Sequence, residues 1–183
     1  MLRVIIFSLI ALVVVAFLAH SFGMTPEQIE SRILLTELNI EEGEVYRNAH
    51  RHYPGVTELP SGLQVEVLQL GQGAIPTVDD WVEVHYRGLH LDGREFASTW
   101  RWDAPVTVPI SKTIKGWQEA LVAIPEGTKV RLVIPPSLAY GAAGGGPIGP
   151  EETLIFEIEL LRIVEPPAPM EIDPLQQRVP GLV

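Results

Sequence analysis

Cysteine is absent from the 183 residues, which excludes a disulfide framework and any thiolate chemistry. This absence does not decide between an oxidising and a reducing compartment. Basic residues are scarce as well, with 13 Lys and Arg against 23 Asp and Glu and a formal net charge of −10. So acidic a composition argues against a nucleic-acid partner, because binding phosphates requires clustered basic side chains.

Motifs for covalent or metal chemistry are also missing. No nucleophile motif, phosphate-binding loop or pair of carboxylates at a catalytic spacing stands out, and the glycines at 144–146 do not lie between a strand and a helix. The five histidines show no ligand spacing; His50 and His52 are two residues apart and would face different sides of a helix. We therefore expect neither a metal nor a cofactor.

The one long apolar run lies at the N-terminus. Arg3 precedes residues 4–19, in which Ser8 is the only polar side chain. The run is slightly long for the apolar part of a signal peptide and slightly short for a membrane span. Because Ala19-His20-Ser21 places small residues where a signal peptidase would cut, residues 1–21 are interpreted as a cleaved signal peptide or, alternatively, as an uncleaved membrane anchor. Both interpretations predict export.

Residues 25–53 predict a short helical extension. Thr25-Pro26-Glu27-Gln28 combines a capping residue, a proline at the first helical position and a capping box. Asn39 is expected to cap a second helix that ends before Tyr53-Pro54. Two short helices with narrow apolar stripes bury little surface alone. We expect them to pack on the main domain or, alternatively, to join two copies as a homodimer.

Apolar and polar residues alternate in the main domain, as is typical of strands. The alternating runs are residues 63–67, 82–86, 106–110, 130–134 and 154–161. Residues 112–122 form the one helix-like run, with Ile114, Trp117 and Leu121 on one face. Short connections favour antiparallel pairing, so the predicted fold class is α+β, with about five strands and one covering helix. Residues 165–183 lack periodicity and are interpreted as a Pro-rich, disordered tail.

Aromatic side chains fall at strand ends and in loops of this domain. They are Tyr86, Phe96, Trp117, Tyr140 and Phe156. The strand ending near Tyr86 turns at Asp92-Gly93 and returns through Phe96, which makes these two rings the first candidates for a pocket. Each of the five also has a plain alternative as a core residue, since aromatic side chains supply much of the buried area of a protein.

Four segments resemble the FKBP-type peptidyl-prolyl cis-trans isomerases in their order and spacing. They are Val82-Glu-Val-His-Tyr-x-Gly with Asp92-Gly-x-x-Phe, Ile114-Lys-Gly-Trp-x-Glu-Ala-Leu, Ile134-Pro-x-x-Leu-Ala-Tyr-Gly, and Thr153-Leu-Ile-Phe-x-Ile-Glu-Leu-Leu. The likeness covers residues 59–164, and residues 59–64 resemble the linker of exported bacterial members with an N-terminal helical extension. The resemblance implies a bent antiparallel sheet wrapped around one short helix, with a ligand pocket between them.

The resemblance also implies roles for individual residues. Tyr86 and Phe96 would form walls, Trp117 the floor, Tyr140 would bind a substrate carbonyl through its hydroxyl, and Phe156 would complete the enclosure. Further substrate contacts would come from Val106, Thr113, Ile114 and Ile148. The residue after Phe96 is Asp in most active relatives and is Ala97 here. That change removes a polar partner for the Tyr86 hydroxyl and for the bound backbone.

The implied activity is cis-trans isomerisation of X-Pro bonds in exported proteins, with the periplasm as the expected location. Amide resonance maintains a barrier of about 18–20 kcal/mol to this rotation. A dry apolar pocket favours the twisted, less polar amide and requires neither proton transfer nor a cofactor. The alternative is a catalytically weak or inactive peptide-binding or chaperone module of the same fold, favoured by Ala97 and by the helical extension.

Overall fold

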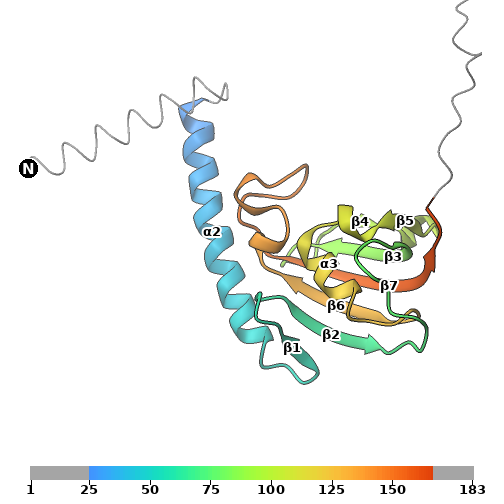
Figure 1. Ribbon diagram of the computed structural model, residues 1–183. Coiled ribbons are helices and arrows are strands. Elements are labelled where there is room, and N and C mark those ends of the chain that lie inside the picture. Colours follow the sequence, from blue (N-terminus) through green and yellow to red (C-terminus); the bar gives the residue numbers. More distant parts are fainter. Residues whose placement is uncertain (1–24, 167–183) are drawn as a thin grey trace, which may run out of the picture.

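The computed structural model describes residues 25–166, so the apolar run at 4–19 and residues 167–183 of the tail lie outside the described residues. The long helix α2 (Pro26–His50) precedes an antiparallel sheet, and the short helix α3 (Lys115–Leu121) covers one face of that sheet (Figure 1). Neither helix combines the length and the apolar character that a membrane span needs.

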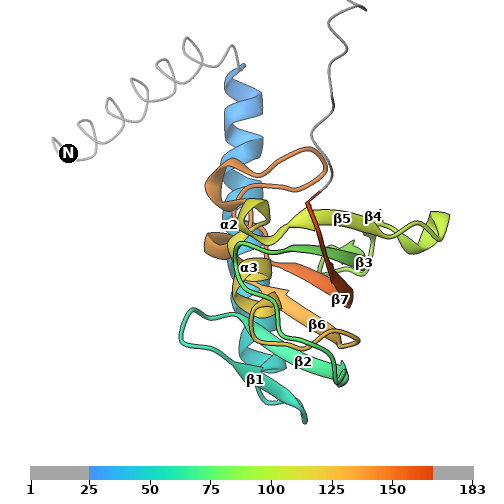
Figure 2. The ribbon, with the colours of Figure 1, turned by 45° about the vertical axis from the view of Figure 1, so that its right-hand side comes forward.

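The sheet has seven strands, all paired antiparallel. They are β1 (Val56–Glu58), β2 (Gln64–Gln69), β3 (Trp81–Leu89), β4 (Glu95–Ser98), β5 (Val106–Pro109), β6 (Lys129–Ile134) and β7 (Leu154–Val164). Their order is β1-β2-β6-β7-β3-β4, and Figure 2 shows them rising from β1 to β4.

Strand β3 has two successive partners on the same side, which bends that edge of the sheet. Its first residues, 81–84, pair with β5, and its last, 87–89, pair with β4.

The α+β class and the bent antiparallel sheet predicted from the sequence are confirmed. The two additional strands, β1 and β4, have three and four residues. Such short runs are too brief for alternation to reveal them.

The N-terminal extension is one helix in the structure, not the two short helices expected from the sequence. Its start is as predicted, because Thr25 and Gln28 form a capping box. Asn39 does not cap a second helix: its side-chain amide donates to the carbonyl of Pro150 at 2.7 Å, a partner 111 residues away. A tertiary hydrogen bond has replaced the local bond that makes Asn a capping residue.

The C-terminal end of α2 packs on the sheet. The Nδ1 atom of His50 lies 2.8 Å from Oε1 of Gln64, whose Nε2 donates to the carbonyl of Arg47 at 2.8 Å. A Cβ atom on Gly43 would lie 2.4 Å from Oγ1 of Thr153, so the helix backbone approaches the start of β7 closely. The extension therefore packs on the main domain, which was one of the two arrangements expected from its sequence.

Helix α3 begins at Lys115, later than the predicted run at 112–122. Residues Ile110–Lys112 form a separate 3₁₀ turn, and the hydroxyl of Thr113 donates to the carbonyl of Ile110 at 2.7 Å. A Cβ atom on Gly116 would lie 2.7 Å from Cγ2 of Ile134, so the backbone of α3 rests directly on β6. Each side chain fully buried between helix and sheet contributes roughly 1.5–3 kcal/mol by removal from water.

Candidate functional site

A hollow of about 330 Å³ opens between α3 and the inner face of the sheet. Strands β3, β5 and β7, the turn before α3 and the segment after β6 all contribute to it. Its lining residues are Tyr86, Val106, Val108, Lys112, Thr113, Ile114, Trp117, Tyr140 and Phe156. Apolar side chains predominate, and no carboxylate is among the lining residues in the described part of the chain. The hollow is therefore suited to binding an apolar group without acid–base chemistry.

Three rings form the floor in edge-to-face contacts. The ring of Trp117 lies 5.1 Å from that of Tyr86 and 5.4 Å from that of Phe156, with interplanar angles of 78° and 89°. Such pairs contribute about 0.5–1.5 kcal/mol beyond area burial, and they fix ring orientation. Trp117 is 6% exposed, and its indole Nε1 has no hydrogen-bond partner within residues 25–166.

Phe96 supports this floor from behind. Its ring lies 5.6 Å from that of Phe156 at 84° and 5.1 Å from that of His90, and it is not among the residues that line the hollow. Gly88 provides the space, because a Cβ atom there would lie 2.4 Å from two ring atoms of Phe96. The structure therefore places Phe96 one layer behind the hollow.

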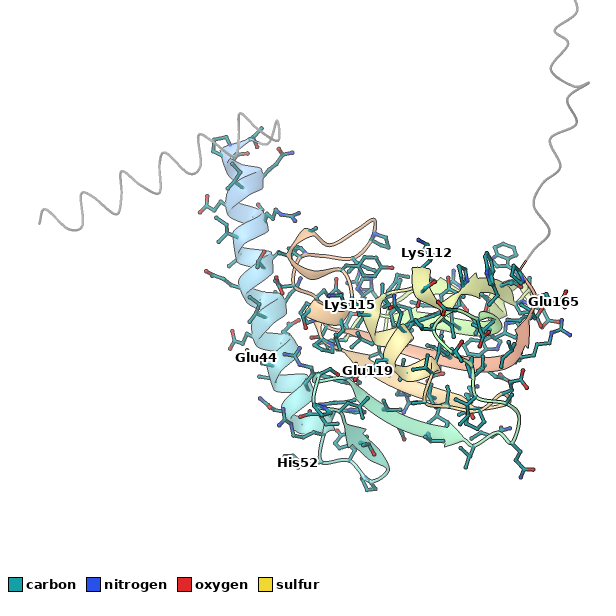
Figure 3. All side chains as sticks on the ribbon, in the orientation of Figure 1. Glu44, His52, Lys112, Lys115, Glu119 and Glu165 are labelled. Atoms are coloured by element: carbon teal, nitrogen blue, oxygen red, sulfur yellow. The ribbon has the colours of Figure 1, made fainter. Side chains whose placement is uncertain are left out.

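The rim is formed by residues outside the regular strands. Tyr140 follows the 3₁₀ turn Pro136–Leu138 and is 41% exposed. Thr113 and Ile114 come from the turn that leads into α3, where Nε2 of Gln118 donates to the Thr113 carbonyl at 2.7 Å. Lys112 also lines the hollow, and Figure 3 shows its side chain extending outward above α3.

Seven of the ten predicted site residues line the hollow, and Phe96, Ala97 and Ile148 do not. Ile148 is 7% exposed and belongs to the buried core, while Ala97, on β4, lies opposite Gly88 of β3.

Sequence reasoning missed two residues that line the hollow, Val108 and Lys112. Strand alternation could have found Val108, since it lies two residues after Val106 on the same strand. Lys112 carries no such signal, because it lies in an irregular turn.

No group of three or more His, Asp or Glu residues that could hold a metal ion occurs between residues 25 and 166. A network of charged side chains lies on the opposite face of the sheet. There Glu157 accepts hydrogen bonds from Arg87 at 2.9 Å and from Arg131 at 3.0 Å. Burial alone would raise the pKa of Glu157, but the two guanidinium groups together hold that pKa below its ordinary value.

Comparison with known proteins decides the family. Residues 73–161 match the FKBP-type peptidyl-prolyl cis-trans isomerase family. The solved structure of a peptidyl-prolyl cis-trans isomerase from Pseudomonas syringae pv. tomato is 37% identical to this chain, with a TM-score of 0.66, and the match covers 71% of this chain and 96% of that one. The chain belongs to the FKBP-type peptidyl-prolyl cis-trans isomerase family. The resemblance inferred from the four segments is thereby confirmed.

Two further relatives extend the comparison. The structure of FkpA from Escherichia coli is 32% identical, with a TM-score of 0.69, and the match covers 87% of this chain and 82% of that one. The outer membrane protein MIP of Legionella longbeachae is 43% identical over 128 residues, which are 69% of this chain and 55% of that protein. The chain spans about half the length of the curated relatives it matches.

Proposed function

We propose that this chain is a peptidyl-prolyl cis-trans isomerase that binds proline-containing polypeptide segments in the hollow between α3 and the sheet. The observation that carries the proposal is the solvent-accessible hollow with a floor of three edge-to-face rings and Tyr140 at its rim. Family membership and the names of the matched relatives support the same activity.

Catalysis would follow from preferential binding of the twisted amide. The floor at Trp117 seats the proline ring, with Val106 and Phe156 as its apolar surroundings. In a site with little water, the planar and more polar amide loses its solvation, whereas the twisted amide loses less. The Tyr140 hydroxyl donates to a carbonyl of the flanking backbone and so fixes the segment. No covalent intermediate and no proton transfer are required.

A second candidate is a peptide-binding or chaperone module with weak or no isomerase activity. The observation that favours it is the methyl group at Ala97, where most active members of the family have a carboxylate, together with a lining that has no carboxylate in the described part of the chain. Without that acid, a bound backbone loses one polar contact, and the rotation is less strongly assisted.

The two candidates are separated by a proline-peptide isomerisation assay on the wild-type protein and on Ala97→Asp. We expect the wild type to accelerate isomerisation and Ala97→Asp to raise kcat/KM further, by about tenfold for one restored charge-assisted hydrogen bond. Ser98→Asp is the matched control, since it adds the same charge one residue further along β4, on the other side of the strand. No acceleration by either protein would reject the isomerase in favour of the binding module.

We propose further that the protein is exported to the periplasm, with residues 1–21 as a signal peptide or membrane anchor and exported proteins as substrates. The apolar run at 4–19 and the name of the Legionella relative, an outer membrane protein, support this proposal. Fractionation of cells expressing the full chain tests it. Recovery of the protein in the cytoplasm, unchanged by deletion of residues 2–21, would contradict export.

A homodimer through the N-terminal helix is the proposed assembly. Large apolar side chains along α2 are exposed, among them Leu34 at 67% and Val45 at 65%. Leu34, Leu38 and Val45 recur at the spacing of one helical stripe, which a second copy could cover. Sedimentation of the wild type and of Leu34→Glu tests this: we expect a dimer that the variant dissociates, and a monomeric wild type would contradict it.

A further inference from the structure

The loop 141–150 flanks the hollow and has little regular structure of its own. It follows Tyr140 directly and contains Ile148. Five of its ten residues are glycine, which leaves its backbone unusually free. Its internal backbone bonds join Gly145 and Ile148 in both directions, at 2.9 and 3.0 Å, and Gly144 to the carbonyl of Gly141 at 3.3 Å. The N–H of Glu151, just after the loop, also donates to the Gly141 carbonyl, at 2.9 Å. Apart from the buried side chain of Ile148, contacts from outside the loop are therefore needed to fix its position.

Two side chains of α2 supply such bonds at the two ends of the loop. Nη2 of Arg32 donates to the carbonyls of Ala142 and Ala143 at 3.0 and 2.9 Å. Nδ2 of Asn39 donates to the carbonyl of Pro150 at 2.7 Å. Arg32 and Asn39 are seven residues apart, so they project from the same face of the helix two turns apart. The loop lies beside α2 in both views (Figure 1 and Figure 2).

The contact is close as well as polar. A Cβ atom on Gly149 would lie 2.9 Å from Nδ2 of Asn39 and 3.6 Å from Cδ2 of Leu35, so the loop backbone rests on the helix. The N–H of Gly149 also donates to Oε2 of Glu152 at 2.7 Å. The C-terminal end of the loop is therefore held between α2 and Glu152, two residues before β7.

The two ends of α2 have different partners. The C-terminal end, at Arg47 and His50, bonds to Gln64 of β2 and fastens the helix to the sheet. Arg32 lies 18 residues before His50 and bonds to loop carbonyls. The bonds of Arg32 are therefore separate from those that attach α2 to the sheet.

We propose that Arg32 and Asn39 are positioning residues through which α2 holds the loop 141–150 and thereby sets the affinity of the hollow for prolyl segments. This inference rests on the proposed function of the hollow. The link to the hollow is Tyr140: a Cβ atom on Gly145 would lie 3.2 Å from Cδ1 of the Tyr140 ring, so the loop backbone packs against that ring. A displaced loop leaves the Tyr140 ring without this support, while the floor rings remain in place.

The experiment compares the full chain with the double variant Arg32→Ala/Asn39→Ala by amide hydrogen exchange and isomerisation kinetics. We expect exchange within 141–150 to accelerate by roughly three- to tenfold, the effect of losing one or two net hydrogen bonds, while exchange in β6 and β7 is unchanged. KM should rise by a similar factor with little change in kcat. Arg32→Lys, which keeps the charge and a donor, should recover part of the protection.

The matched control is Arg51→Ala, which removes the arginine directly after α2, where it pairs with Glu58 at 3.5 Å and does not touch the loop. It should leave loop exchange and KM as in the wild type. Unchanged loop exchange in the double variant overturns the inference, and so does an increase of equal size throughout the sheet. A wild type without isomerase activity rejects the proposed function instead, and the exchange data still decide whether α2 holds the loop.

Discussion

The two faces of the sheet are built from the same strands but carry different chemistry. On the inner face, Phe156 and Tyr86 contact Trp117 of α3 and line a hollow. On the outer face, Glu157, the next residue after Phe156, lies between Arg87 and Arg131, and Arg131 also pairs with Glu66 at 2.8 Å. One position along a strand thus separates a ring that binds a neighbouring ring from a carboxylate that binds two guanidinium groups.

The inner face therefore forms the site through the packing of aromatic rings, whereas the outer face contributes ion pairs between neighbouring strands. The ion pairs on the outer face join β2, β6, β7 and β3, neighbours in the sheet, and so support its register. The inner face instead positions apolar rings against one helix. Substitutions on the inner face should therefore affect activity and stability together, and those on the outer face stability alone.

The largest effect is expected for Phe156→Ala. Phe156 is 3% exposed and contacts three other aromatic rings, so its truncation should lower the free energy of unfolding by about 3–5 kcal/mol and nearly abolish isomerase activity. Ile155→Ala is the control on the outer face, at 7% exposure. Ile155→Ala should lower the free energy of unfolding by about 2–4 kcal/mol and leave kcat/KM unchanged. Denaturant unfolding and the isomerisation assay are measured on both variants. Equal losses of activity would contradict the different roles of the two faces.

Gly88→Ala should have the next largest effect. The added methyl group would lie 2.4 Å from the Phe96 ring and 2.9 Å from Cε1 of Phe156, so the rings must move. Overpacking of this kind costs about 1–3 kcal/mol. Because the moved ring of Phe156 belongs to the lining, affinity for a proline peptide should fall as well. Unaltered peptide affinity would show that the layer behind the hollow does not position its floor.

Glu157→Gln should lower stability by about 1–2 kcal/mol at neutral pH, a value reduced for the partial exposure of both arginines. Burial alone would raise the pKa of Glu157, but its two arginine partners lower that pKa in the folded state below its ordinary value. The stability that Glu157 contributes is therefore fully present at a pH above the ordinary pKa, and it is lost as the pH falls through the folded-state pKa. The difference in the free energy of unfolding between Glu157→Gln and the wild type should therefore become smaller towards acid pH. Denaturant unfolding at several pH values measures it. Glu83→Gln, which removes a carboxylate paired with one exposed arginine, Arg162, is the control and should lower stability by less.

Tyr140→Phe should have the smallest effect. It removes one hydroxyl group from a residue that is 41% exposed, so the free energy of unfolding should not change. Loss of the proposed hydrogen bond to substrate should reduce kcat/KM by about fivefold, which corresponds to about 1 kcal/mol. A variant as active as the wild type would show that the rim binds through the ring alone.

The family, the fold class and most of the site could be predicted because their signals are local. Strand alternation indicated β3 and β7, and the four matching segments placed Tyr86, Trp117, Tyr140 and Phe156 around one pocket. The single helix α2 could not be predicted, because Asn39 is a capping residue by local chemistry and its actual partner is the Pro150 carbonyl, 111 residues away. Phe96 behind the floor and Lys112 at the rim likewise depend on how distant segments pack.

We propose that prolyl segments bind the inner face of the sheet, and two tryptophans, Trp117 and Trp100, report on the inner and outer faces. Trp117 lies in the floor of the hollow, while Trp100 stacks on His85 of the outer face at 5.7 Å between ring centroids. The most direct measurement is a titration of the ¹⁵N-labelled protein with a proline-containing peptide, following the assigned indole N–H resonances. The account predicts that the Trp117 resonance shifts and saturates while that of Trp100 stays in place. A shift confined to Trp100 and Trp102, with Trp117 unmoved, would contradict it.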